Sequence, residues 1–92
     1  MKATWNNVVI ALSTETIIIE NNHYFPASGV HTEYLKQNGE SYTCPWKGHA
    51  DYYDVVVGGE TNKGAAWMYP APSDKAKEIT GYYAFWKGVT IE

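Results

Sequence analysis

The feature that most restricts the fold is a long hairpin signal between residues 49 and 69. The segment "HADYYDVVV" (49–57) is the strongest strand signal in the chain, because β-branched and aromatic residues dominate it. A Gly-Gly pair at 58–59 then predicts a tight turn. The chain would return along "ETNKGAAWMY" (60–69). We therefore expect a β-hairpin here.

Other parts of the chain also carry hairpin signals. Two β-branched runs, at 8–12 and 16–20, are separated by "STE", a spacing typical of a hairpin. The Asn-Gly pair at 38–39 is the pair that a type I′ turn prefers. A strand at 40–44 would follow this turn. Further extended segments are expected at 22–26, 82–86 and 89–92.

Only one helix is predicted. Ser73 is a suitable N-cap for a short helix near residues 73–80, which Gly81 would end. Ser28 is a weaker candidate for capping a single helical turn. About eight short strands against one short helix predict an all-β, or β-dominated, fold class.

Length and composition restrict the protein class. A chain of 92 residues has room for a single domain, 1–92, and 45% hydrophobic residues with 15% aromatics supply a dense core. The net charge is −3 and every cationic side chain is a lysine. Without arginine, a mildly acidic domain is a poor candidate for binding duplex nucleic acid.

Cysteine usage and hydropathy indicate a compartment. A single cysteine excludes an intramolecular disulfide, so a cystine-stapled secreted fold is not expected. No apolar run approaches the roughly 20 residues that cross a bilayer, and the N-terminus lacks a signal-peptide core. We therefore expect a soluble, cytoplasmic protein with no membrane partner.

A short pattern occurs three times. Tryptophan is followed by Asn-Asn or Lys-Gly at 5–7, 46–48 and 86–88. Repeats of this period normally show longer self-similarity, so we interpret the pattern as a turn at a strand end, where left-handed residues are needed.

The segment "TCPWKGHADYY" (43–53) concentrates reactive side chains. Its Cys44 and His49, with the distant His23 and His31, are the only soft metal ligands. They do not form the two closely spaced pairs of a structural zinc site, so no metal or other cofactor is expected.

Nucleophilic and carboxylate chemistry are weakly supported. Lys47 and His49 are local candidates to activate the Cys44 thiol, but no orienting third group is recognisable, and a core cysteine is the favoured interpretation. Asp51 and Asp54 are three positions apart in a strand, so they face opposite sides of the sheet unless a bulge intervenes.

The aromatic residues are too numerous to be buried completely. Alternation along strands places Tyr52 and Tyr53 on opposite faces, and likewise Tyr82 and Tyr83. Rings that are not core predict a groove near Lys47 and Lys63, suited to a small, planar or anionic ligand.

Several segments together resemble a bacterial family, domain of unknown function 427, which is sometimes classed as nucleotidyltransferase-like. The matching segments are "TWNNVVIA", "HYFP", "CPWKG" before "ADYYDVVV", "NKGAAWMYP" and "GYYAFWKGVTIE". The resemblance implies a small β-dominated domain with open, tent-like antiparallel sheets. Its motif positions are Tyr24, Phe25, Cys44, Lys47, Gly48, Tyr52, Trp67 and Pro70.

The chain departs from the chemistry of such relatives. Nucleotidyltransferases need a Gly-Ser turn and a D-x-D pair for a divalent metal, and both are missing. The paired C-x-x-C motifs of tent-like zinc proteins are missing too.

Three hypotheses remain. The first is a small-molecule or peptide binding module. Its candidate residues are Tyr24, Cys44, Lys47, His49, Tyr52, Lys63 and Trp67. The second is an enzyme that uses Cys44 or Lys47. The third is a structural protein that forms a homodimer through an edge strand or aromatic patch. Ligand, reaction and the choice between monomer and homodimer stay open.

Overall fold

The computed structural model describes residues 1–92. It contains nine strands and three short 3₁₀ helices, which confirms the β-dominated fold class with several antiparallel sheets. The strands are β1 (Lys2–Trp5), β2 (Val8–Leu12), β3 (Ile17–Ile19), β4 (Asn22–Tyr24), β5 (Leu35–Cys44), β6 (Gly48–Val57), β7 (Glu60–Met68), β8 (Tyr83–Phe85) and β9 (Thr90–Ile91). The helices are η1 (Ala27–Gly29), η2 (Thr32–Tyr34) and η3 (Asp74–Ile79). None of them has the length and apolar composition needed to span a bilayer.

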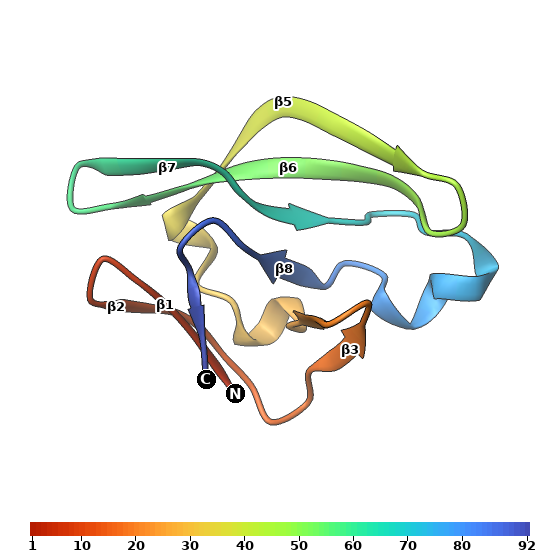
Figure 1. The fold of residues 1–92 in the computed structure, drawn as a ribbon, viewed down its shortest axis with the longest axis horizontal. Coiled ribbons are helices and arrows are strands. Elements are labelled where there is room, and N and C mark those ends of the chain that lie inside the picture. Colours follow the sequence, from red (N-terminus) through yellow and green to blue (C-terminus); the bar gives the residue numbers. More distant parts are fainter.

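The largest sheet has the strand order β5-β6-β7-β8 and contains the predicted hairpin (Figure 1). β6 and β7 pair in antiparallel fashion, from the partners Asp51 and Met68 at one end to the partners Val57 and Glu60 at the turn. Gly58 and Gly59 form the turn between them with φ angles of 60° and 82°, which glycine adopts without steric cost. The Gly-Gly hairpin prediction is therefore confirmed.

Two smaller sheets complete the fold: β2-β1-β9 and β3-β4. In Figure 1 they lie on the opposite side of β8 from β5 and β6. Phe25, just after β4, exchanges two backbone hydrogen bonds with Tyr83 on β8, with N···O distances of 2.8 and 2.9 Å. This bridge attaches the β3-β4 hairpin to the free edge of the largest sheet.

The predicted hairpin between 8–12 and 16–20 is wrong. β2 pairs backward with β1, and β3 pairs forward with β4. The reason is local: the residue pairs 6–7 and 20–21 have φ angles between 50° and 66°. Two consecutive left-handed residues form the two-residue turn that suits a hairpin.

The Asn38-Gly39 pair does not reverse the chain, contrary to prediction. β5 runs through it with a register shift between Gln37 and Ser41. Asn38 makes a different use of its side chain, because its Nδ2 donates to the Asp54 carboxylate at 2.8 Å. An Asn-Gly pair inside a strand is thus accommodated as a bulge.

The predicted helix at 73–80 is a kinked 3₁₀ segment, η3, and not an α-helix. Ser73 occupies the N-cap position but makes no side-chain cap bond. Its hydroxyl donates instead to the carbonyl of Trp46, so Ser73 joins η3 to the β5–β6 turn. Near Ser28 the chain likewise forms only single 3₁₀ turns, η1 and η2.

The three tryptophan-containing turns behave as interpreted. Left-handed φ angles occur at Asn6 and Asn7, at Gly48, and at Lys87 and Gly88. Each of the three turns therefore contains at least one asparagine, lysine or glycine with a positive φ angle, as such turns require.

The largest sheet separates two buried clusters. We call them the Phe25 cluster and the Tyr24 cluster after adjacent residues on opposite faces. The buried members of the Phe25 cluster are Ala3, Ile10, Ala11, Phe25, Val30, Val55, Val57, Ala65, Ala66 and Phe85. Those of the Tyr24 cluster are Tyr24, Cys44, Ala50, Trp67, Tyr69, Ala76, Ile79 and Ala84. Tyr53 and Tyr83 pack on the first cluster and Tyr52 and Tyr82 on the second, as strand alternation predicts.

Candidate functional site

The candidate site is built around Lys47, in the turn between β5 and β6. Cys44 ends β5 and pairs with Gly48, which begins β6. The carbonyl of Lys47 accepts a hydrogen bond from the backbone N–H of Ser73 at 2.8 Å. The turn is thus fixed against η3, and Lys47 is 5% exposed.

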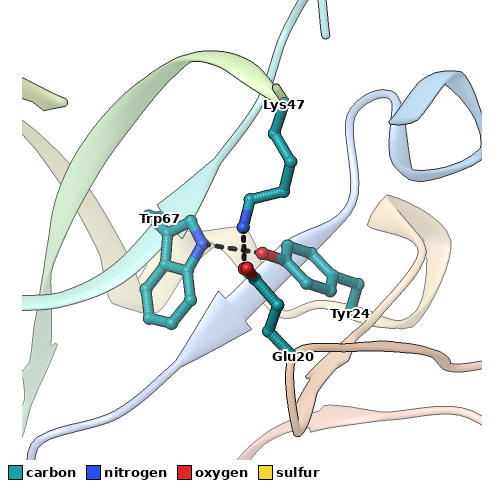
Figure 2. Close-up of polar contacts among 4 residues, drawn as sticks. All are labelled: Glu20, Tyr24, Lys47 and Trp67. Atoms are coloured by element: carbon teal, nitrogen blue, oxygen red, sulfur yellow. Dashed lines mark hydrogen bonds and ion pairs between the residues drawn. The ribbon is translucent and has the colours of Figure 1, made fainter. Parts of the chain in front are cut away.

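The ammonium of Lys47 lies among aromatic rings and one carboxylate. Its Nζ donates to the Glu20 side chain and forms an ion pair with it (Figure 2). Nζ also lies 5.1 Å from the ring centroid of Trp46 and 5.9 Å from that of Tyr69, within the range of cation–π attraction. The ammonium has three N–H donors, and Glu20 is its one hydrogen-bond partner.

Tyr24 and Trp67 form the wall beside this ion pair. The indole Nε1–H of Trp67 donates to the Tyr24 hydroxyl at 3.2 Å, and the rings meet edge to face. Figure 2 shows this bond beside the Lys47–Glu20 contact. Tyr69 lies 6.4 Å from Tyr24, and Tyr52 lies 6.3 Å from Trp67, between ring centroids. The ammonium is therefore bordered by a continuous set of rings.

The ion pair is charged near neutral pH. Burial lowers the pKa of Lys47, but the hydrogen bond to Glu20 and the nearby Tyr24 and Cys44 outweigh it, and the net pKa is raised. The hydrogen bond from Lys47, in turn, lowers the pKa of Glu20. Both shifts favour ammonium with carboxylate over the neutral pair.

The phenols around the ammonium stay neutral. Burial raises the pKa values of Tyr24, Tyr52 and Tyr69. The site therefore combines one buried positive charge, neutral hydroxyl groups and flat apolar rings, a combination suited to an anionic group on a planar body.

The structure brings five of the predicted site residues together. Tyr24, Cys44 and Trp67 are buried members of the Tyr24 cluster, Tyr52 packs against it, and Lys47 points into it. The position of Cys44 is interior, at 8% exposure.

His49 and Lys63 lie apart from this group. His49 is exposed, with its Nε2 3.5 Å from the Asp51 carboxylate. Lys63 is exposed on β7, and its carbonyl accepts a hydrogen bond from Lys87. No group of three potential metal ligands forms anywhere in the chain.

Sequence reasoning missed three residues of the site: Glu20, Trp46 and Tyr69. Trp46 adjoins Lys47 in the segment 43–53, so its position next to a candidate residue could have indicated that it belongs to the site. Glu20 was not recognisable, because it is a glutamate in a left-handed turn, with a φ of 53°.

The one surface pocket of the structure lies at the outer end of the aromatic set. Its volume is about 420 Å³ and its lining residues are Glu40, Ser41, Tyr42 and Tyr52. Tyr52 is the predicted site residue that reaches it.

Comparison with known proteins gives a family for the chain. No curated protein matches the sequence. The family model described as Domain of unknown function (DUF427) matches residues 1–91, which is nearly the full chain. The chain therefore belongs to the DUF427 family.

Proposed function

We propose that this domain is a binding module for a small molecule or peptide that carries a carboxylate, and that Lys47 receives the carboxylate. One observation carries the proposal: Lys47 is an almost fully buried ammonium, and its single hydrogen-bond partner, Glu20, has a side chain that is 55% exposed.

Stability alone does not account for a lysine at this position. Removing an ammonium from water costs several kcal/mol, and well-packed apolar residues often serve a fold as well as a buried ion pair does. A buried charge among aromatic rings is a recurrent feature of functional sites. This comparison supports a binding role for Lys47.

The donor capacity of Lys47 supports an anionic ligand. Its one hydrogen-bond partner within the protein is a carboxylate, that of Glu20, and the rings of Trp46 and Tyr69 flank the charge. A carboxylate of a ligand would make the same charge-assisted bond, and a planar body would stack on the rings.

Glu20 occupies the position that the carboxylate of the ligand would take. It belongs to the two-residue turn between β3 and β4 and is mostly outside the core. Its side chain can therefore be displaced by rotation, without unpacking either cluster. In this proposal Glu20 acts as an internal substitute for the ligand.

The enzyme alternative has less support. A lysine nucleophile must lose its proton, whereas Glu20 and its neighbours raise the pKa of Lys47 above its ordinary value despite burial. The Cys44 thiol is buried in the Tyr24 cluster. Homodimerisation through an edge strand or an aromatic patch stays a prediction.

The test is an NMR titration with benzoate, a planar carboxylate, and with benzamide, its uncharged counterpart. We expect benzoate to shift the amide signals of Lys47 and Glu20, and benzamide to leave them unchanged. Glu20→Gln should bind benzoate more tightly than the wild type, because the internal competitor has lost its charge. Lys47→Met should not bind it.

Lys63→Met is the matched control, because it removes an exposed lysine far from the site. It should bind benzoate as the wild type does. If folded Glu20→Gln shows no saturable shift with benzoate, the proposal is wrong. Equal effects of Lys63→Met and Lys47→Met would indicate a general charge effect instead.

A further inference from the structure

A surface pocket lies on the face of the largest sheet that carries the Tyr24 cluster, and Lys47 is not among its lining residues. The pocket of about 420 Å³ is lined by Glu40, Ser41, Tyr42 and Tyr52. Tyr42, on β5, is 54% exposed and one of the few large exposed hydrophobic side chains of the protein.

The strand register explains why these side chains converge. Tyr42 on β5 pairs with Ala50 on β6, so Tyr52 is the diagonal neighbour of Tyr42 on the same face. Tyr52 pairs with Trp67, and the two rings lie 6.3 Å apart with an angle of 30°. The inner wall of the pocket is therefore held in place by the Tyr24 cluster.

The bulge in β5 positions the carboxylate of the pocket. The backbone N–H of Glu40 donates to the Asn38 side chain at 2.8 Å, and the same Asn38 bonds to Asp54. Glu40 is thus anchored at its backbone while its side chain lines the pocket.

Glu40 has no ion-pair partner. The ion pairs of the structure join Lys2 to Glu92, Lys47 to Glu20 and His49 to Asp51. Lys87 lies in the same region, because its Nζ and a carboxylate oxygen of Glu40 both approach Gly64. Its Nζ lies over the Trp86 ring, 5.1 Å from the centroid, and forms no ion pair with Glu40.

We propose that this pocket binds an alkylammonium group, with Glu40 as its counter-charge and the faces of Tyr42 and Tyr52 as its aromatic walls. Two rings beside an unpaired carboxylate are the arrangement that recognises organic cations. The shared chemistry is the ammonium group, whether it belongs to a free amine or to a modified lysine of a peptide. The site is separate from Lys47 and takes the opposite charge.

Local electrostatics agree with a cation here. Burial raises the pKa of Tyr52, and the negative charge of the Glu40 carboxylate raises it further, so the phenol stays neutral. A cation entering the pocket would therefore meet the negative charge of Glu40 beside an uncharged ring.

The test uses choline as the probe. The comparison compound is its uncharged isostere, in which a carbon atom replaces the nitrogen. We expect choline to shift the amide signals of Ser41, Tyr42 and Tyr52 in a saturable manner, and the isostere to bind about threefold more weakly or not at all. Glu40→Gln should weaken choline binding by a similar factor. Tyr42→Leu should weaken it too.

Matched variants separate this site from general charge effects and from the Lys47 site. Glu33→Gln removes an exposed carboxylate elsewhere and should leave choline binding unchanged. Lys87→Met removes a cation that approaches Gly64 together with Glu40, and it should strengthen choline binding. Glu40→Gln should retain benzoate binding at Lys47, so a failure of either proposal leaves the other testable.

A peptide with one trimethyllysine among glycines and serines identifies the source of the ammonium group. Tighter binding of this peptide than of choline assigns a peptide source, and equal binding assigns a free amine. If neither choline nor the peptide gives saturable shifts, or if the isostere binds as well as choline, the proposal is overturned.

Discussion

The indole N–H of Trp67 on β7 donates to the hydroxyl oxygen of Tyr24 on β4, across 3.2 Å and 43 positions of sequence. The bond lies inside the Tyr24 cluster, where both residues are at most 8% exposed. It connects the largest sheet to the hairpin that carries Glu20. The position of the carboxylate partner of Lys47 thus depends on a buried polar contact between two aromatic residues.

Tyr24→Phe removes this contact. The Trp67 N–H would then be buried without an acceptor, and we expect the free energy of unfolding to fall by about 1–3 kcal/mol. Urea denaturation measures the change. Tyr82→Phe is the control, because Tyr82 packs on the same cluster without a hydrogen bond from its hydroxyl, and it should cost far less. Equal losses in the two variants would contradict the role of the bond.

The two members of the ion pair should respond differently to substitution. Glu20→Gln leaves the buried Lys47 ammonium without a counter-charge and should lower the free energy of unfolding. Lys47→Met replaces the ammonium by an apolar group of similar length, so its stability should equal or exceed that of the wild type. Chemical denaturation measures the free energy of unfolding of both variants, and Lys47→Met should be the more stable of the two. If Lys47→Met is instead the less stable variant, the ion pair is a net source of stability.

Acid should destabilise the domain through two carboxylates. The hydrogen bond from Lys47 lowers the pKa of Glu20 below 4.5, and that from Asn38 lowers the pKa of Asp54 below 3.8. A folded-state pKa below the unfolded value contributes stability that is complete above the unfolded pKa and is lost as pH falls through the folded pKa. Unfolding free energies measured from neutral pH downward should therefore decline from about pH 4.5.

Variants assign this decline to its two sources. Asp54→Asn and Glu20→Gln should each reduce the slope with which the free energy of unfolding falls toward acid pH. An unchanged slope in both variants would show that other groups control acid unfolding.

Gly48 has a backbone conformation that residues with a side chain rarely adopt. Its φ is +110°, and a Cβ would lie 3.4 Å from both Pro72 and the backbone nitrogen of Ser73. Gly48→Ala should therefore lower stability by about 1–3 kcal/mol through backbone strain. Gly39→Ala, at a φ of +81° with open space around it, is the matched control. Thermal unfolding should show the larger loss at Gly48.

The thiol of Cys44 should be protected in the folded protein. It is 8% exposed and lies in the Tyr24 cluster, so iodoacetamide can reach it only when the structure opens. We expect labelling to be slow in buffer and fast in urea, as followed by mass spectrometry. Equally fast labelling in both would return Cys44 to consideration as a reacting group.

Local signals in the sequence predicted those parts of the fold whose cause is local. The Gly-Gly turn between β6 and β7 follows from two adjacent residues that favour left-handed conformations. The opposite faces of Tyr52 and Tyr53 follow from alternation along one strand. Neither feature depends on a distant contact.

The pairing of the strands and the place of Glu20 in the site depend on contacts between residues that are distant in the sequence. Asn38-Gly39 has the composition of a turn, but Asn38 binds Asp54 on the neighbouring strand, and the pair forms a bulge within β5. Glu20 becomes a partner of Lys47 only because β4 joins the edge of β8, which brings a distant hairpin to the β5–β6 turn. The Lys47 motif was recognisable from the sequence, whereas its counter-charge was not.

The division into two buried clusters has a consequence for how the molecule opens. β8 is three residues long, yet Ala84 faces the Tyr24 cluster while Phe85 belongs to the Phe25 cluster. Detachment of this one short strand would expose both buried clusters to water at once. It would also break the backbone hydrogen bonds between Tyr83 and Phe25. This short edge strand of the largest sheet therefore couples the two clusters into one cooperative folding unit.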